Sequence, residues 1–226
     1  GSPSSSARSP EADVGRPMAA LDLTTRWPVD RVAAAVVAQG RTVAAVGDTG
    51  HAFRLASITK PLVSWAILVA VEEGTVALDD QIGQPDCTLR HLLSHAGGYA
   101  FDGPDPIAKP GRTRVYSNTG IELAAGALTD ACGIATADYL TEAVLAPLAM
   151  TGTALPGSPA HGARGTVDDL ARFVVELRTP TLVSGATRDD AFIHHRRRHQ
   201  VVALEGLRRL AHVVEPVQRQ HVAAHH

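Results

Sequence analysis

Ser57 and Lys60 are candidate catalytic residues, because a hydroxyl and an amine stand three positions apart where a long apolar segment begins. On a helix they are neighbours on one face. A serine at the positive end of a helix, beside an amine, has the parts of an activated nucleophile for acyl transfer. The alternative is that Ser57 only caps the helix and that Lys60 is an exposed side chain of its first turn.

The second motif is Tyr116-Ser117-Asn118, which contains the only asparagine of the chain and one of its three tyrosines. It follows the turn-forming pair Pro110-Gly111 and precedes a stretch with helical periodicity, so we expect a loop that presents Tyr116 and Asn118 ahead of a helix. A phenol can pass a proton, and an amide can hydrogen-bond a substrate or a neighbouring side chain. The alternative is an ordinary turn, for which Asn followed by Thr-Gly is well suited.

These residues need a scaffold, and the hydrophobic pattern predicts one of mixed type. Residues 62–71 are apolar on all sides, which is typical of a buried helix, and Pro61 is tolerated in its first turn. That helix is therefore predicted to begin close to Ser57. Two short runs, residues 32–38 and 42–46, flank Gly40 and predict an antiparallel hairpin. Further helices are expected over residues 88–95, 120–132, 136–145 and 166–177, the last with Thr166 as its cap.

His91 and His95 stand at i and i+4, the spacing with which two histidines on one helix face bind zinc. No glutamate follows His91 and no third ligand is found in the sequence. We therefore interpret both as structural histidines with satisfied hydrogen bonds. The Pro- and Gly-rich residues 102–111 are expected to form a loop at the wall of a site.

Length and composition exclude several classes of function. With 226 residues, 45% hydrophobic and 19% charged, the chain can bury a real core. A formal net charge of −2 gives no reason to expect nucleic acid or an anionic membrane as a partner. Cys87 and Cys132 are interpreted as free thiols. No apolar run is long enough to span a bilayer and the first residues lack a secretion signal, so we expect a cytoplasmic protein, or one whose signal is absent from this chain.

Together the two motifs resemble the penicillin-recognising serine hydrolases of the class C β-lactamase-like family, which includes DD-peptidases and β-lactamase-like esterases. Ser57-Ile58-Thr59-Lys60 is similar to the S-x-x-K motif of that family, and Tyr116-Ser117-Asn118 is similar to its second motif. Other similar segments follow in the family's order between about Val32 and Val183. They are Glu73-Gly74, Leu78-Asp79-Asp80, Leu92-Leu93-Ser94-His95, Pro110-Gly111, Pro147-Leu148-Ala149-Met150 and Val167-Asp168-Asp169-Leu170-Ala171.

The resemblance implies an α+β fold in which an antiparallel sheet is flanked by helices and joined by a mostly helical region. It implies that Ser57 attacks a carbonyl and becomes acylated, with its backbone N–H as one half of an oxyanion hole. Lys60 and Tyr116 would take and return the proton. Asn118 would bind the substrate amide or hold Lys60. The implied substrate is a small molecule: a β-lactam, a D-alanyl peptide or a small ester. No metal and no cofactor is implied, and the oligomeric state is not predicted.

The third motif of the family, K-T-G or H-x-G on a late strand, has no counterpart after Val183, so we expect the C-terminal strands to be truncated. Residues 191–226 instead hold seven of the eleven histidines and six arginines against two acids. The sequence therefore predicts a flexible leader over residues 1–30, an incomplete hydrolase domain over residues 31–190 and an atypical basic tail over residues 191–226. Within the tail, the spacing of Val201, Leu204, Leu207, Leu210 and Val214 could mark one amphipathic helix.

Two functions from different classes follow from these patterns. The first is a β-lactamase-like serine hydrolase, whose activity the missing third motif would impair. The alternative is a catalytically inactive remnant that keeps the cleft and binds a ligand or a protein partner. Binding of nucleic acid through the basic tail is not favoured, because the chain as a whole is not basic.

Overall fold

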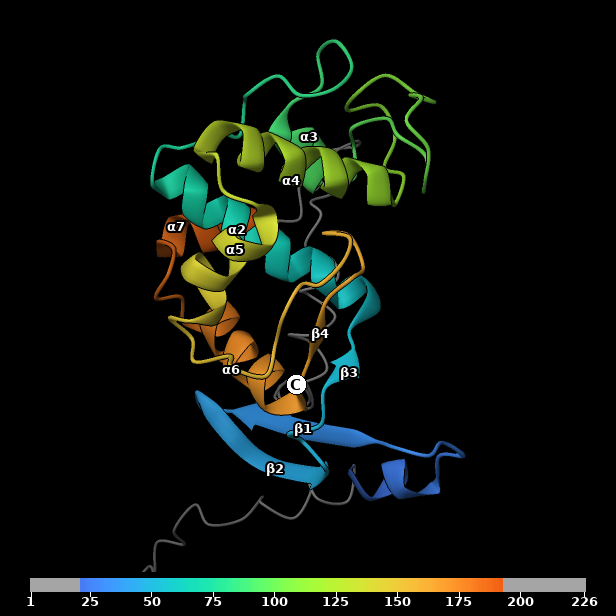
Figure 1. Ribbon diagram of the computed structural model, residues 1–226, viewed down its shortest axis with the longest axis vertical. Helices are drawn as coiled ribbons and strands as arrows, with labels where there is room; N and C mark the ends of the chain where they lie inside the picture. The colour runs from blue at the N-terminus through green and yellow to red at the C-terminus, as the bar shows by residue number, and fades with distance from the viewer. Residues whose placement is uncertain (1–20, 193–226) are drawn as a thin grey trace, which may run out of the picture.

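The computed structural model describes residues 21–192, and in that range it consists of helices and short antiparallel strands (Figure 1). This arrangement confirms the predicted α+β class. The strands are β1 (Ala33–Ala38), β2 (Arg41–Gly47), β3 (Phe53–Arg54) and β4 (Arg164–Gly165). The α-helices are α2 (Thr59–Glu72), α3 (Leu89–Leu93), α4 (Asn118–Cys132), α5 (Thr136–Leu140), α6 (Val167–Arg178) and α7 (Gly185–Phe192). Shorter helical turns are η1 (Leu23–Arg26) and η2 (Ala56–Ile58), both of 3-10 type, and the π-type η3 (Thr141–Leu145).

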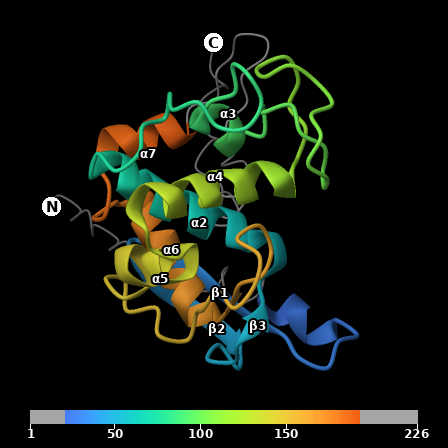
Figure 2. The ribbon, with the colours of Figure 1, turned by 45° about the horizontal axis from the view of Figure 1, so that its top comes forward.

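Helix α2 is the centre of the core. All twelve residues from Thr59 to Ala70 are buried, as an apolar helix without a solvent face requires. The helix contacts α4 on one side and α5 with η3 on another, and it crosses the middle of the molecule in Figure 1 and Figure 2. Its fully buried Trp65 packs edge-on against Phe173 of α6, with ring centroids 6.2 Å apart. The predicted buried helix is confirmed.

The β1–β2 hairpin turns at Gly40 and lies against α6 at one end of the molecule (Figure 1). Both turn residues, Gln39 and Gly40, have a positive φ, as a tight hairpin turn commonly requires. Val37 of β1 packs against Ala171 and Val174 of α6. The sequence predicts this hairpin correctly, with each strand end within one residue of the observed one.

A second and smaller strand pair fixes the beginning of α2. Strand β3 pairs antiparallel with β4, and the N–H of Leu55, which follows β3, donates to the carbonyl of Ala163 at 2.9 Å. The chain then passes through η2 into α2. The predicted helix start is therefore close but not exact: the α-helix begins at Thr59, and Ser57 lies in the 3-10 turn before it.

The other predicted helices are present with local differences. Thr166 caps α6 as predicted, its Oγ1 accepting a hydrogen bond from the N–H of Asp169 at 3.1 Å. The helix predicted over residues 136–145 divides into α5 and the π-type η3. Cys87 and Cys132 are free, as expected. Among the described helices, none combines the length and apolar character needed to cross a membrane.

Several predictions fall on parts of the chain that lie outside the described residues. The tail at 191–226 lies outside them except for its first two positions. The amphipathic helix predicted at 201–214 lies wholly outside them. Of the leader at 1–30, only residues 21–30 are described, and they include η1. The division into leader, domain and tail stays a prediction.

A buried carboxylate joins the C-terminal end of α6 to its neighbours. Glu176 is 2% exposed and accepts hydrogen bonds from the indole N–H of Trp65, from the N–H and hydroxyl of Thr181 and from the N–H of Leu182, at 2.7 to 3.3 Å. These bonds connect α6 with α2 and with the segment that leads to α7. Because a buried charge is tolerated only when it is hydrogen-bonded, the four donors make this carboxylate compatible with the core.

Replacing Glu176 by alanine should lower the free energy of unfolding by about 3 kcal/mol, because the donors of Trp65, Thr181 and Leu182 then lose their acceptor. Urea unfolding followed by circular dichroism measures the change. Glu142→Ala, which removes an exposed carboxylate, is the matched control and should cost less than about 0.5 kcal/mol. Equal losses in the two variants would contradict this account of the α6 end.

Candidate active site

Ser57 lies in η2, directly before the N-terminus of α2, and is exposed. The residue before it, Ala56, has a φ of 47°, in the left-handed region that alanine rarely adopts. Thr59 holds this turn, because its Oγ1 donates to the carbonyl of Ala56 at 2.6 Å and accepts from the N–H of Ala163 at 3.0 Å. A strained residue beside an exposed hydroxyl is a feature that functional sites often show.

The Lys60 side chain is buried, at 3% exposure, and its ammonium group reaches three oxygen atoms. Nζ donates to Asn118 Oδ1 at 2.6 Å, to the carbonyl of Ala160 at 2.9 Å and to Ser57 Oγ at 3.3 Å. An ammonium has three donors, so these acceptors satisfy all of them. All three are uncharged groups, and they come from three separate segments of the chain. The alternative of an exposed first-turn lysine is therefore wrong.

Tyr116 and Asn118 approach Lys60 from the beginning of α4. Asn118 is the first residue of this helix rather than a loop residue, and Ser117 is the cap, its Oγ accepting from the N–H of Gly120 at 3.0 Å. Tyr116 stands just before the cap and is 39% exposed. The centroid of its ring lies 4.8 Å from Lys60 Nζ, within the range of a cation–π contact.

The structure thus brings together the four residues singled out by the two motifs, Ser57, Lys60, Tyr116 and Asn118. Lys60 is the common member, because it contacts each of the other three.

Asp102 sets the orientation of the Asn118 amide. Its Oδ1 accepts a hydrogen bond from Asn118 Nδ2 at 2.9 Å. A carboxylate only accepts and an ammonium only donates, so the amide nitrogen must face Asp102 and the amide oxygen must face Lys60. The chain of contacts from Asp102 through Asn118 to Lys60 therefore has one consistent hydrogen-bonding arrangement.

His91 and His95 do not form a zinc pair; the Nδ1 of each accepts a hydrogen bond from a backbone N–H. His91 takes part in a capping box at the start of α3, in which its Nδ1 accepts from the N–H of Thr88 at 3.2 Å. His95 is 2% exposed, and its Nδ1 accepts from the N–H of Ser117 at 3.2 Å. Its Nε2 has no hydrogen-bond partner among the described residues, so the prediction of fully satisfied histidines is wrong for this atom. Within residues 21–192 no group of three or more His, Cys, Asp or Glu is arranged to hold a metal ion.

Burial and, to a smaller extent, the positive charges of Arg114 and Lys60 together lower the pKa of His95 to about 3. The imidazole is therefore neutral at neutral pH. This agrees with the hydrogen bond that Nδ1 accepts, which an imidazolium could not accept because both of its nitrogens carry protons.

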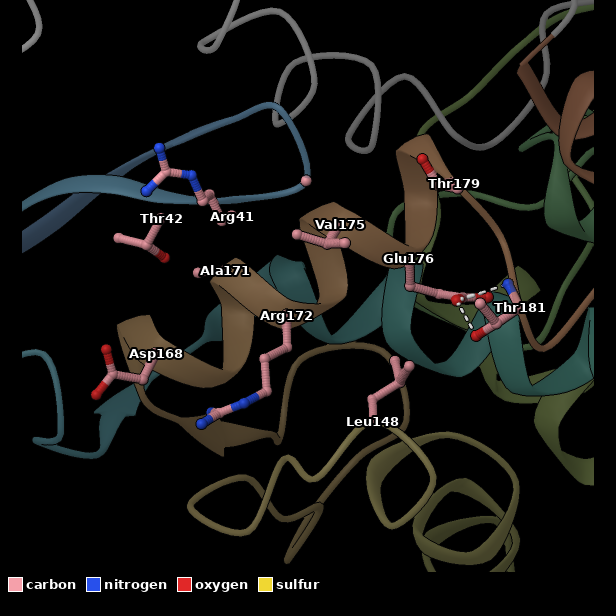
Figure 3. A pocket seen from close by; sticks show the side chains of 11 residues that line it. Arg41, Thr42, Leu148, Asp168, Ala171, Arg172, Val175, Glu176, Thr179 and Thr181 are labelled. Carbon is pink, nitrogen blue, oxygen red and sulfur yellow. Dashed lines mark hydrogen bonds between the residues drawn. The ribbon is translucent and has the colours of Figure 1, made fainter. Parts of the chain in front are cut away.

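A pocket of about 430 Å³ lies away from these residues, between the turn of the β1–β2 hairpin and α6 (Figure 3). Arg41 of the hairpin and Arg172 of α6 line it, and Glu176 faces Thr181 at one end. None of the four motif residues lines it. Because reactive groups identify an active site better than volume does, we place the candidate site at Ser57 and not in this pocket.

The sequence matches the profile of the Beta-lactamase family over residues 28–212. The chain belongs to this family. The match covers most of the chain and extends past residue 192, into the segment that the sequence analysis separated as a tail. The family resemblance read from the two motifs is confirmed, and with it membership in a family of β-lactamase-like serine hydrolases.

Individual relatives agree with the family match. A β-lactamase from Mycobacterium bovis has a solved structure that is 46% identical, with a TM-score of 0.75 over 76% of this chain and 64% of its own. A penicillin-binding protein of Bacillus subtilis is 27% identical over 138 residues, 46% of this chain and 31% of its own. Esterase EstB of Burkholderia gladioli is 36% identical over 63 residues, 22% of this chain and 16% of its own. The chain thus spans less than two thirds of the length of each, and the structural likeness confirms the predicted β-lactamase-like fold.

Sequence reasoning missed three contacts that build the site. The carbonyl of Ala160 carries no signal in a sequence, because every residue has one. Asp102 begins the Pro- and Gly-rich loop predicted to wall a site, so its position was indicated but its contact with Asn118 was not. The bond from Ser117 to His95 joins two segments that only the fold brings together.

The buried neutral His95 should make the folded state sensitive to acid. Its pKa is about 3 when folded and about 6.5 when unfolded, so below pH 6.5 the unfolded state binds more protons. The stability that depends on the neutral ring is complete above about pH 6.5 and is lost progressively as the pH falls towards 3. We expect wild type to lose more stability than His95→Asn between pH 7 and pH 4, measured by urea unfolding at each pH. Parallel losses in both proteins would contradict the burial of a neutral imidazole.

Proposed function

We propose that this protein is a serine hydrolase that acts through an acyl-enzyme formed on Ser57. The observation that supports this most directly is the 3.3 Å contact between Lys60 Nζ and the exposed Ser57 hydroxyl, within a cluster that includes Tyr116 and Asn118. Nucleophilic catalysis by serine needs a proton acceptor within reach of the hydroxyl, and such contacts are often long before substrate binds.

In the proposed reaction, Ser57 Oγ attacks the carbonyl carbon of the substrate. For this step Lys60 must be the neutral amine, so its ammonium first releases one proton to solvent. The free lone pair of the amine then takes the proton of Ser57, and Tyr116 relays it towards the leaving group. The charge that develops on the substrate oxygen is stabilised by the backbone N–H of Ser57 and by the positive end of α2. The bond to the leaving nitrogen or oxygen then breaks, and the leaving group receives the proton.

Deacylation uses the same groups in the opposite sense. Tyr116 and Lys60 take a proton from a water molecule, which attacks the acyl carbon and returns the hydroxyl of Ser57. Asn118 keeps the Lys60 amine in place through the 2.6 Å bond to its Oδ1 and is positioned in turn by Asp102. The bonds of Asn118 and Asp102 therefore serve the proposed reaction by positioning Lys60.

The proposed substrate is a small molecule with a reactive carbonyl: a β-lactam, a D-alanyl peptide or a small ester. The names of the relatives, a β-lactamase, a penicillin-binding protein and an esterase, support this range. All three kinds of substrate transfer an acyl group to a serine, so one cluster of residues can serve each of them. The choice among them depends on the walls of the cleft rather than on the cluster.

A fluorescent penicillin or a fluorophosphonate should label wild type at Ser57, and Ser57→Ala should abolish the label, because the acyl group has no other activated hydroxyl to join. Mass spectrometry of the intact protein and of its peptides measures both. Folding is checked by circular dichroism under the same conditions. A folded wild-type protein that forms no adduct with either probe would contradict the proposal and would favour the inactive remnant that binds without turnover.

The chain offers a matched control for Lys60, because Lys109 is the only other lysine and is exposed. Lys60→Met should slow acylation of Ser57 by about 100- to 10,000-fold, the usual effect of removing a group that transfers a proton. Lys109→Met should leave the rate unchanged. Time-resolved labelling measures the acylation rate constant of each variant. Similar rate constants in Lys60→Met and Lys109→Met would exclude Lys60 from the chemistry.

A further inference from the structure

His95 contacts the Tyr116 segment on both sides of the tyrosine. Its carbonyl accepts a hydrogen bond from the N–H of Val115 at 2.9 Å, and its ring Nδ1 accepts one from the N–H of Ser117 at 3.2 Å. The two residues that flank Tyr116 are thus bonded to one histidine. His95 itself has a φ of 57°, in the left-handed region, which places its carbonyl and its ring against the same segment.

The ring of His95 also packs against the ring of Tyr116. Their centroids are 4.5 Å apart with the planes at 47°, and Phe101 stacks on Tyr116 at 6.2 Å with the planes at 24°. Lys60 Nζ stands 4.8 Å from the centroid of the same ring. The phenol is therefore held by two backbone bonds beside it and by two aromatic rings, while 39% of the residue stays exposed.

The imidazole contributes one interaction that an apolar side chain of similar size would not. Nδ1 is its acceptor for Ser117, so in the neutral ring the proton is on Nε2, and that atom has no partner among the described residues. An orphan buried donor is unfavourable, and a leucine at this place would avoid it. The one polar contact that the ring makes within the described residues is the bond to the cap residue of α4, directly beside Tyr116.

We propose that His95 is a positioning residue, which through its neutral Nδ1 and its ring fixes the Tyr116 phenol next to Lys60. This inference rests on the proposed function, in which Tyr116 transfers a proton. His95 does not take part in the proton transfer itself. Its contribution is to hold the phenol in one place, which matters because a misplacement of about 1 Å can lower a rate about 100-fold.

The test compares two substitutions of His95. His95→Asn keeps an acceptor, since Asn Oδ1 stands close to the place of His Nδ1, and asparagine tolerates a positive φ. His95→Leu keeps the bulk but has no acceptor. Both proteins are first shown to be folded by circular dichroism and by a cooperative unfolding transition.

The first readout is independent of activity. The chain has three tyrosines, so protein labelled with 3-fluorotyrosine should give three ¹⁹F signals, and Tyr116→Phe assigns the one of interest. We expect His95→Leu to shift or broaden the Tyr116 signal and to leave those of Tyr99 and Tyr139 in place. His95→Asn should keep the Tyr116 signal close to that of wild type. An unchanged Tyr116 signal in folded His95→Leu would overturn the proposal.

The second readout separates binding from chemistry. We expect His95→Leu to lower the acylation rate constant of Ser57 by about 10- to 100-fold with little change in the reversible dissociation constant of the probe, and His95→Asn to recover most of the rate. Equal rates in His95→Leu and wild type would overturn the proposal. If wild type forms no adduct, the proposed function fails, and the fluorine spectrum alone then decides whether His95 positions Tyr116.

Discussion

The buried Lys60 ammonium is the constraint on which the rest of this structure depends. A charge inside a protein is costly unless its hydrogen bonds are complete, and here no acceptor carries a compensating negative charge. Its three donors meet oxygens of Ser57, Asn118 and Ala160, at 2.6 to 3.3 Å. If any of these three is displaced, a buried donor is left without a partner. The lysine therefore fixes the relative positions of three segments. Its contact with Ser57 also places an amine beside the hydroxyl of that residue.

The fold supplies these segments from different directions. Helix α2 is apolar all round and occupies the centre, so Lys60 in its first turn is buried together with it. The β3–β4 pair and the bonds of Thr59 hold the turn that carries Ser57. Asn118 is positioned by the cap of α4. His95 accepts a hydrogen bond from the cap residue and Asp102 accepts one from Asn118, both from the segment that precedes α4. The packing of the core therefore determines the geometry of the site, because the central helix α2 belongs to both.

Much of this was accessible from the sequence where the signal is local. The all-apolar run after Pro61 predicts the buried helix, the runs around Gly40 predict the hairpin, and Thr166 predicts the start of α6. The spacing of Ser57 and Lys60 predicts their contact, because residues at i and i+3 on a helix are neighbours wherever the helix lies.

Contacts between distant segments were not accessible in the same way. Ala160 approaches Lys60 through a backbone carbonyl, which no residue type reveals. His95 had a spacing typical of a zinc ligand, but its Nδ1 receives a backbone N–H instead. Asn118 was expected in a loop and stands in the first turn of α4, because Ser117 caps the helix. Serine and asparagine are both good caps, so the sequence alone does not decide which of the two takes that position. From the sequence, only the resemblance to a family predicted that the two motifs lie in one site. The structure shows their contacts directly.

The burial and complete hydrogen bonding of the Lys60 ammonium can be measured directly, because the chain has only two lysines. Protein labelled with ¹⁵N-lysine should give one side-chain signal that exchanges slowly with water, from Lys60, and one that exchanges fast, from the exposed Lys109. We expect the slow signal to be assigned by its loss in Lys60→Met and to exchange faster in Asn118→Ala, which removes its shortest hydrogen bond. Two fast-exchanging signals in folded wild-type protein would contradict the account.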